Sequence, residues 1–187
     1  QDKLYAEGKE SLILILQAMD AAGKDSAIKH VMSSVDPQGL DVHSMKEPTS
    51  EELSHDFLWR TGVHLPPRGK MAIFNRSYYE DVLIVKVHQL QKAYEMADRC
   101  LDDKEFFEKR YRQIRHFEEY LYENSYRVVK IFLNVSKEEQ KKRFKKLQES
   151  KASAFRVTKE DLKRNEHFEK YKEMNDEMLE KTDTTYA

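Results

Sequence analysis

The chain has 187 residues, enough for one domain that buries a core of its own. Apolar residues make up 39%, charged residues 36% and aromatic residues 11%, a balance that argues against disorder. The net charge of −1 gives no overall attraction to nucleic acid, and the single cysteine, Cys100, excludes an internal disulfide and a cysteine-built zinc site. No apolar run approaches about twenty residues, so we expect no membrane span, no signal peptide and a cytoplasmic protein.

Short apolar runs alternate with helical periodicity along the chain. The expected strands are residues 11–18, 40–45, 71–75 and 127–133. The first expected helix starts after Lys24 and ends before Pro37, and the second runs from a capping box at Thr49 and Glu52 through Leu58. Helical periodicity also covers 91–124, with a break at 101–103, and the last two expected helices are 137–149 and 158–181. This alternation predicts an α/β fold over 1–187, a single domain with a mostly parallel sheet and helices on both faces.

A glycine-lysine loop joins the first strand to the first long helix. Its sequence, AMDAAGKDS, covers residues 18–26. The backbone N–H groups of Ala21, Ala22, Gly23, Lys24 and Asp25 can surround an anion, while the helix N-terminus and the Lys24 ammonium add positive charge. The loop departs from the usual nucleotide-binding pattern, because Ala18 replaces the first glycine and Asp25 follows the lysine. We predict a phosphate site, with a small-residue turn and a solvated lysine as the alternative.

Two further side chains fit phosphate chemistry. Asp20 places a carboxylate inside the loop, where it would repel phosphate unless a cation lay between them; magnesium is the expected cation, and a turn-forming aspartate is the alternative. Arg76 follows the third buried strand, where polar residues of a parallel sheet usually face a ligand. Its planar guanidinium can neutralise charge on two phosphate oxygens, and the alternative is an exposed loop residue.

The segment from Lys137 to Lys151 is locally basic, which could provide the wall of a channel for a long polyanion. About half of these charges would be ordinary solvated positions. Aromatic side chains near Tyr79 could stack on a base, although aromatic residues beside a sheet are more often core.

At these residues the chain resembles the type 2 polyphosphate kinases, whose fold is similar to that of thymidylate kinases. The resemblance runs from about Leu12 to Val87, through 130–143, and loosely to the end. The motifs that carry it are AMDAAGKDS, IKHVMSSVDPQG, EELSHDFLWR, HLPPRG and FNRSYYEDVL. Because the sequence starts at Gln1 and the family usually continues beyond Ala187, we expect a piece of a longer chain.

The resemblance implies a role for individual positions. Gly23, Lys24, Asp25 and Ser26 match the phosphate cradle, Asp20 the metal-linked acid, and Arg76 the arginine that stabilises transferring phosphates. Arg143 resembles the arginine of a helical lid, which we place at about 137–160. Asn75 stands where other members have aspartate, and with Glu80 it looks like the subgroup that accepts AMP as well as ADP. The remaining candidates are Glu80 as a second metal-linked acid, and Tyr79, Lys142 and Lys146 as nucleotide or lid contacts.

The resemblance implies reversible transfer of the terminal phosphoryl group of inorganic polyphosphate to AMP or ADP, with ATP among the nucleotides bound and magnesium, or manganese in its place, as cofactor. One rival is a nucleoside-monophosphate kinase that uses ATP as donor. The other is a non-catalytic phosphate- or nucleic-acid-binding module. We expect no nucleic-acid partner, no membrane partner and a homo-oligomer.

Overall fold

The computed structural model describes residues 1–19, 21–149 and 168–187 of the chain. Within them, four parallel strands form one sheet in the order β2-β3-β1-β4. The strands are β1 (Ser11–Ala18), β2 (Leu40–Ser44), β3 (Met71–Asn75) and β4 (Tyr126–Leu133). All four predicted strands are confirmed, with β2 ending and β4 beginning one residue earlier than expected.

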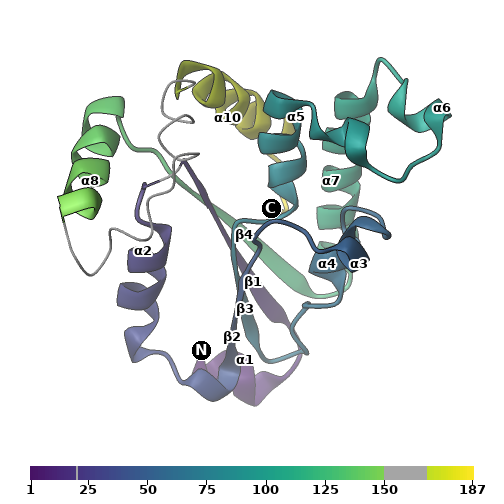
Figure 1. The fold of residues 1–187 in the computed structure, drawn as a ribbon. Coiled ribbons are helices and arrows are strands. Elements are labelled where there is room, and N and C mark those ends of the chain that lie inside the picture. The colour runs from purple at the N-terminus through teal and green to yellow at the C-terminus, as the bar shows by residue number, and fades with distance from the viewer. Residues whose placement is uncertain (20, 150–167) are drawn as a thin grey trace.

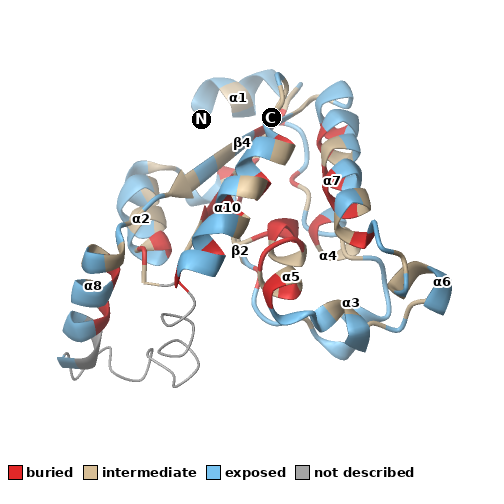
Figure 2. Cartoon of the chain, turned by 90° about the horizontal axis from the view of Figure 1, so that it is seen from above, coloured by how far each residue is buried: buried red, intermediate tan, exposed pale blue. Residues whose placement is uncertain are grey.

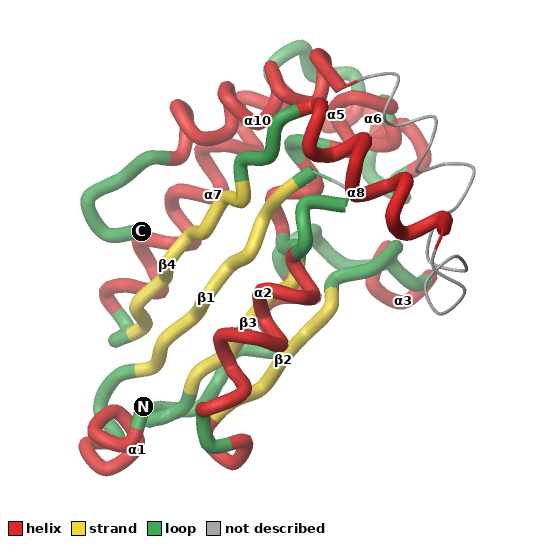
Figure 3. The backbone as a smooth tube through the Cα atoms, turned by 90° about the vertical axis from the view of Figure 1, so that its left-hand side faces the viewer, coloured by secondary structure: helices red, strands yellow, loops and turns green. Residues whose placement is uncertain are grey.

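Helices lie on both sides of this sheet, as the alternating pattern predicted (Figure 1). Helices α2 and α8 lie on one side, in front of the strands in Figure 3, while α5, α7 and α10 lie on the other. The α-helices are α1 (Asp2–Glu7), α2 (Lys24–Val31), α3 (Ser50–Leu53), α4 (Trp59–Gly62), α5 (Ile84–His88), α6 (Asp98–Leu101), α7 (Phe106–Glu123), α8 (Lys137–Glu149) and α10 (Phe168–Thr182). The 3₁₀ turns are η1 (Met32–Ser34), η2 (Pro37–Gly39), η3 (Tyr78–Asp81) and η4 (Leu90–Ala93).

The strand register brings three loops to the same edge of the sheet. Leu16 of β1 pairs with Asn75 of β3, and Asn75 pairs with Ser44 of β2. Because the strands are parallel, the segments that follow these residues all leave the sheet at its carboxyl edge. The glycine-lysine loop therefore meets the segments after β2 and β3.

The core lies mainly between the sheet and α7, where buried residues recur along the helix (Figure 2). Ile13 and Ile15 of β1 point into it, together with Ile114 and Leu121 of α7. Their helical spacing of seven residues keeps the last two on one face of α7. Burial of each such side chain contributes about 1.5–3 kcal/mol, which fixes the scaffold under the loops.

One predicted helix is wrong in extent. The capping box between Thr49 and Glu52 is present, with both hydrogen bonds formed, but α3 ends at Leu53 and does not continue through Leu58. The Asp56 carboxylate accepts a hydrogen bond from the Leu58 N–H at 2.9 Å, which offers the backbone a turn in place of a helix. The chain becomes helical again only at α4.

Two further helix predictions are also wrong in extent. The first long helix ends at Val31 and continues only as the 3₁₀ turn η1, and residues 91–97 form part of η4 and irregular chain instead of α-helix. The expected break near 101–103 separates α6 from α7, and α8 has the predicted bounds. The last helix is described only from Phe168, so 158–167 of that prediction lie outside the described residues, as does the 150–160 part of the expected lid. No helix in the described ranges is long and apolar enough to cross a membrane.

Candidate phosphate-transfer site

The glycine-lysine loop has the backbone geometry of an anion cradle. Gly23 has φ 94° and Ala21 has φ 57°, so the chain turns tightly before α2 starts at Lys24. Lys24 is 9% exposed, and its Nζ donates hydrogen bonds to the carbonyl oxygens of Ala18 at 2.9 Å and Met19 at 3.5 Å. The ammonium is thus held across the mouth of the loop. Asp20 lies outside the described residues.

The end of β3 is tied directly to this loop. Asn75 donates from Nδ2 to the Asp25 carboxylate at 2.6 Å, and the Arg76 N–H donates to the Leu16 carbonyl at 3.0 Å. Arg76 has φ 66°, the left-handed region that a non-glycine residue adopts only at some cost. The fold holds the arginine in this conformation at the carboxyl edge of the sheet, where a ligand is expected.

Helix α8 reaches the loop through one arginine. The Nη1 of Arg143 donates to the Ala22 carbonyl at 2.6 Å, while its Nε pairs with Glu139 one turn earlier at 2.9 Å. A Cβ atom added to Gly23 would lie 3.1 Å from the Arg143 guanidinium. Glycine is therefore favoured at this position both by its positive φ and by the close approach of Arg143.

These elements enclose an open cleft of about 780 Å³. It is lined by loop residues 21–26, by residues 44–47 after β2, by Asn75 and Arg76, and by Arg143, Phe144 and Lys146 of α8. Five cationic side chains and the N-terminus of α2 surround it: Lys24, Lys46, Arg76, Arg143 and Lys146. Such a concentration of positive charge fits a ligand with several phosphate groups.

Two other predicted residues lie outside the lining of this cleft. Glu80 is held from β1, since Gln17 donates from Nε2 to its Oε1 at 2.5 Å. Lys142 is exposed on α8 and does not contribute to the lining, whereas Lys146 does. A metal role for Glu80 and a lid role for Lys142 remain predictions.

Tyr79 is placed in the core, which argues against its role as a nucleotide contact. It is 2% exposed, and its hydroxyl donates to Glu118 at 2.6 Å; the Tyr78 hydroxyl donates to the same carboxylate oxygen at 2.8 Å. Burial and the neighbouring Glu118 carboxylate raise the pKa of Tyr79 far above its ordinary value. The aromatic pair after β3 is thus packed under the sheet, the alternative that the sequence left open.

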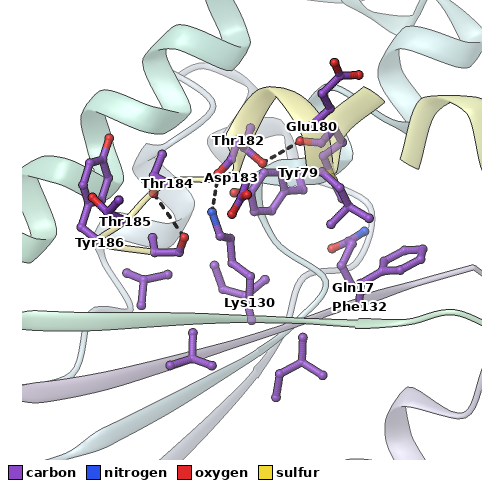
Figure 4. A pocket seen from close by; sticks show the side chains of 17 residues that line it. Gln17, Tyr79, Lys130, Phe132, Glu180, Thr182, Asp183, Thr184, Thr185 and Tyr186 are labelled. Atoms are coloured by element: carbon purple, nitrogen blue, oxygen red, sulfur yellow. Dashed lines mark hydrogen bonds between the residues drawn. The ribbon is translucent and has the colours of Figure 1, made fainter. Parts of the chain in front are cut away.

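A second pocket, of about 800 Å³, lies on the α10 side of the sheet (Figure 4). Its cation, Lys130, donates to the Glu118 carboxylate at 3.1 Å and to the Thr182 carbonyl at 2.6 Å. The lysine charge is therefore already balanced by protein groups. This pocket lacks the convergence of cations found in the cleft, and we assign the phosphate chemistry to the cleft.

Several residues near the site escaped the sequence analysis. Gln17, which donates to Glu80, is a polar residue inside an apolar strand, a signal that could have marked Gln17 as a candidate but not its partner. Asp81, next in sequence, accepts a hydrogen bond from the Tyr94 hydroxyl at 2.8 Å, and desolvation raises the pKa of Asp81 to about 6. Arg110 of α7 lies over the Phe57 ring, 4.0 Å from its centroid. Neither of these two has a sequence signal, because each depends on a long-range contact.

A mostly parallel sheet with a lysine-bearing loop between its first strand and helix defines a P-loop kinase-like fold. The family model described as polyphosphate kinase 2 (PPK2) matches residues 1–187. The chain belongs to the polyphosphate kinase 2 family. The resemblance that the motifs suggested is thereby confirmed.

Individual relatives agree with this family. The chain is 44% identical over 183 residues to an ADP-polyphosphate phosphotransferase of Rhodopseudomonas palustris, covering 97% of this chain and 63% of the relative. It is 37% identical over 187 residues to an AMP/ADP-polyphosphate phosphotransferase of Meiothermus ruber, covering 100% of this chain and 66% of the relative. The crystal structure of polyphosphate kinase 2 from Arthrobacter aurescens TC1 superposes with a TM-score of 0.89 at 40% identity, covering 100% of this chain and 63% of that one. The chain thus spans about two thirds of the length of these relatives.

Proposed function

We propose that the protein transfers the terminal phosphoryl group of inorganic polyphosphate to AMP and ADP, and the reverse. The observation that carries the proposal is the convergence of Lys24, Arg76 and Arg143 on one cleft in a member of this family. The names of the relatives, which specify ADP in one case and AMP or ADP in the other, support the choice of acceptor. Cytoplasmic location and homo-oligomer formation remain expectations.

The mechanism we infer is direct in-line transfer. An oxygen of the acceptor phosphate attacks the terminal phosphorus of polyphosphate, and the bond from that phosphorus to the bridging oxygen breaks. Charge spreads over the equatorial oxygens during transfer, so fixed cations stabilise the transition state more than the ground state. We assign this charge stabilisation to Lys24 and Arg76 at the sheet edge and to Arg143 on α8. No covalent enzyme intermediate is needed.

The described donor set fits a magnesium ion shared with substrate phosphates. Magnesium usually binds through one or two carboxylates, with phosphates and water filling its other positions. The described residues contain no cluster of three or more His, Cys, Asp or Glu, so this part of the chain has no all-protein metal cage. Asp25 lines the cleft and accepts a hydrogen bond from Asn75, so its carboxylate could supply an oxygen ligand. We propose that Asp20 adds a second ligand and that Glu80, from outside the cleft lining, helps to hold the ion when it is bound. The bound ion would neutralise phosphate charge, and manganese could replace it.

A matrix of donors and acceptors tests the proposal. Polyphosphate and ATP are each supplied as the sole donor, with AMP or ADP as acceptor and with magnesium, manganese or chelator present. We expect turnover with polyphosphate and both acceptors, and loss of turnover in chelator. Turnover only with ATP as donor and AMP as acceptor would establish the nucleoside-monophosphate kinase alternative instead.

The non-catalytic alternative predicts a different result in the same assay. A binding module would retain polyphosphate with a steep salt dependence and give no product with any donor. Titration of polyphosphate binding from low to high salt, alongside the activity matrix, separates the two readings.

A further inference from the structure

The segment after β2 forms one wall of the cleft and contributes a cation that the sequence analysis did not single out. Residues 44–47 line the cleft, and Lys46 is the cationic residue among them. The Lys46 side chain is exposed, and within the described residues its ammonium makes no ion pair. By contrast, Lys24 and Arg143 already donate to carbonyls of the phosphate loop. The Lys46 ammonium is therefore available to a phosphate group in the cleft.

The main chain of this wall is anchored on both sides of Lys46. Before Lys46, the Met45 N–H donates to the Asn75 carbonyl at 3.0 Å, which extends the pairing with β3 beyond the end of β2. After Lys46, the capping box at Thr49 fixes the start of α3. The wall is thus a short connection between the sheet and a capped helix.

One arginine holds this connection in two places. Arg60 of α4 donates from Nη2 to the Lys46 carbonyl at 2.9 Å, and its Nε pairs with Glu52 Oε1 of α3 at 3.1 Å. The other carboxylate oxygen of Glu52 accepts the Thr49 N–H at 2.7 Å. The Arg60 and Glu52 side chains are only 18% and 19% exposed, and α3 and α4 lie side by side (Figure 1). A planar guanidinium can make both contacts at once.

The pairing of Arg60 with Glu52 is maintained at neutral pH. Burial alone would raise the pKa of Glu52, but the Thr49 N–H and the Arg60 charge outweigh it and hold that pKa below its ordinary value. The carboxylate is therefore ionised. Neither Arg60 nor Glu52 belongs to the cleft lining, so the pair can affect a substrate in the cleft only through the segment that it holds.

We propose that Lys46 binds a substrate phosphate in the cleft and that Arg60, together with Glu52, is a positioning residue for Lys46. Fixing the main chain at Lys46 limits the space that its ammonium samples, which reduces the entropy lost when it binds a phosphate oxygen. The phosphate belongs to the polyphosphate chain or to the acceptor nucleotide, because both present the same group. The inference rests on the proposed function, since it assumes that substrate phosphates occupy the cleft.

The experiment measures binding of tripolyphosphate and of ADP, each alone with magnesium, by isothermal titration calorimetry, so that no transfer occurs. Lys46→Met removes the charge and keeps an unbranched side chain. We expect it to weaken at least one of the two ligands about tenfold and to reduce the dependence of that affinity on salt concentration. The ligand with the larger loss identifies the source of the phosphate.

A double-mutant cycle tests whether Arg60 acts through Lys46. Arg60→Gln should weaken the same ligand about fivefold in the parent but cause little further loss when Lys46 is already methionine. Arg68→Gln, at an exposed arginine outside the cleft lining, is the matched control and should leave both affinities unchanged. Thermal melting followed by circular dichroism checks that each variant is folded. Glu52→Gln weakens the same contact while keeping its shape, and it provides the second test should Arg60→Gln fail to fold.

Parental affinity for both ligands in folded Lys46→Met overturns the assignment of Lys46 as a phosphate-binding residue. A loss from Arg60→Gln that is equally large with and without the Lys46 ammonium overturns the positioning role. If the parent binds either ligand in a Lys46-dependent way but shows no polyphosphate-dependent turnover, the inference stands and the proposed function falls. The two ideas can therefore fail separately.

Discussion

The charged side chains on the two sides of the sheet have different kinds of hydrogen-bond partner. On the α7 and α10 side, the Glu118 carboxylate is fully buried and accepts hydrogen bonds from Tyr78, Tyr79 and Lys130. On the α2 and α8 side, Lys24 and Arg143 donate to backbone carbonyls of the phosphate loop, and Arg143 also pairs with Glu139 at the surface. A lysine or arginine that donates to a backbone carbonyl can donate to a phosphate oxygen instead at little cost in free energy. A cation paired with a buried carboxylate would lose much more stability if that partner were replaced.

The backbone around the cleft adopts positive φ at three positions. Ala21, Gly23 and Arg76 have positive φ, and all three line the cleft. Strained conformations of this kind persist where the surrounding fold holds them and are often part of a functional site. The comparison teaches that the α10 side stabilises the fold and the α8 side is kept available for ligand, a division that mutations can test.

The largest expected effect is on stability, at Glu118. Glu118→Gln keeps the shape of the side chain but leaves the Lys130 charge without its carboxylate, and should lower the free energy of unfolding by about 3 kcal/mol. Urea denaturation followed by circular dichroism measures this. The neighbouring exposed Glu119→Gln is the control and should change stability by less than about 0.5 kcal/mol. Activity per folded molecule should be unchanged; a specific loss of activity in folded Glu118→Gln would contradict the division of the two sides.

The next effect is on catalysis, at Lys24. Lys24→Ala removes a positive charge from the cleft and should reduce kcat/KM by at least about 10²-fold, or roughly 2.7 kcal/mol, while the protein stays folded. Lys29→Ala, at an exposed lysine of the same helix, is the matched control and should retain near-parental turnover. Equal activity in the two folded variants would contradict the assignment of the loop at Lys24 as the phosphate site.

An intermediate effect is expected at Glu80, whose carboxylate accepts a hydrogen bond from Gln17 of β1. AMP has one phosphate fewer than ADP, so its phosphorylation would need extra support near the acceptor, and we propose that a metal ion held with the help of Glu80 would supply it. Glu80→Gln should therefore impair AMP phosphorylation about tenfold more than ADP phosphorylation, or about 1.4 kcal/mol. Gln17→Leu should shift the ratio in the same direction, because it releases the carboxylate.

A double-mutant cycle identifies whether Gln17 acts through Glu80. If it does, the two changes together should cost little more than Glu80→Gln alone. Gln38→Leu, at an exposed glutamine, is the control. A ratio of AMP to ADP activity within twofold of the parent in both single variants would exclude the role of Glu80 in acceptor choice.

The parts of the site that were predictable from sequence are local in the chain. The loop around Gly23 and Lys24 was visible because a buried strand precedes it and a helix follows it, and Arg76 was visible because it ends another buried strand. Strand bounds followed from apolar runs of the right length. In each case the information lies within about ten residues.

The parts that were missed depend on contacts between distant segments. The sequence around Glu80 does not indicate that Gln17 donates a hydrogen bond to the Glu80 carboxylate. The sequence around Tyr79 does not indicate that the Tyr79 hydroxyl donates to Glu118. The helix predicted after Thr49 was too long for a local reason. The Asp56 side chain accepts a hydrogen bond from the Leu58 N–H, which favours a turn over a helix. The spacing of apolar residues along the sequence gives little sign of such a side-chain to backbone hydrogen bond.

The smallest expected effect concerns pH, at His43 on β2. The His43 ring stacks on His64 and on Phe74, with centroids 4.3 Å and 5.4 Å away. Partial burial, and then the His64 charge, hold the pKa of His43 below its ordinary value of 6.5, and Asp41 opposes the shift. Because the unfolded chain binds this proton more readily than the folded one, its contribution to stability is complete above pH 6.5 and is lost as pH falls through the folded-state pKa. On acidification from about pH 7.5 to 5.5, the parent should therefore lose about 1 °C more in Tm than His43→Gln, a small difference because the ring is largely solvated. NMR titration of the histidine ring protons gives the direct check, and a His43 midpoint at or above 6.5 would show that the stacked ring titrates as a free one.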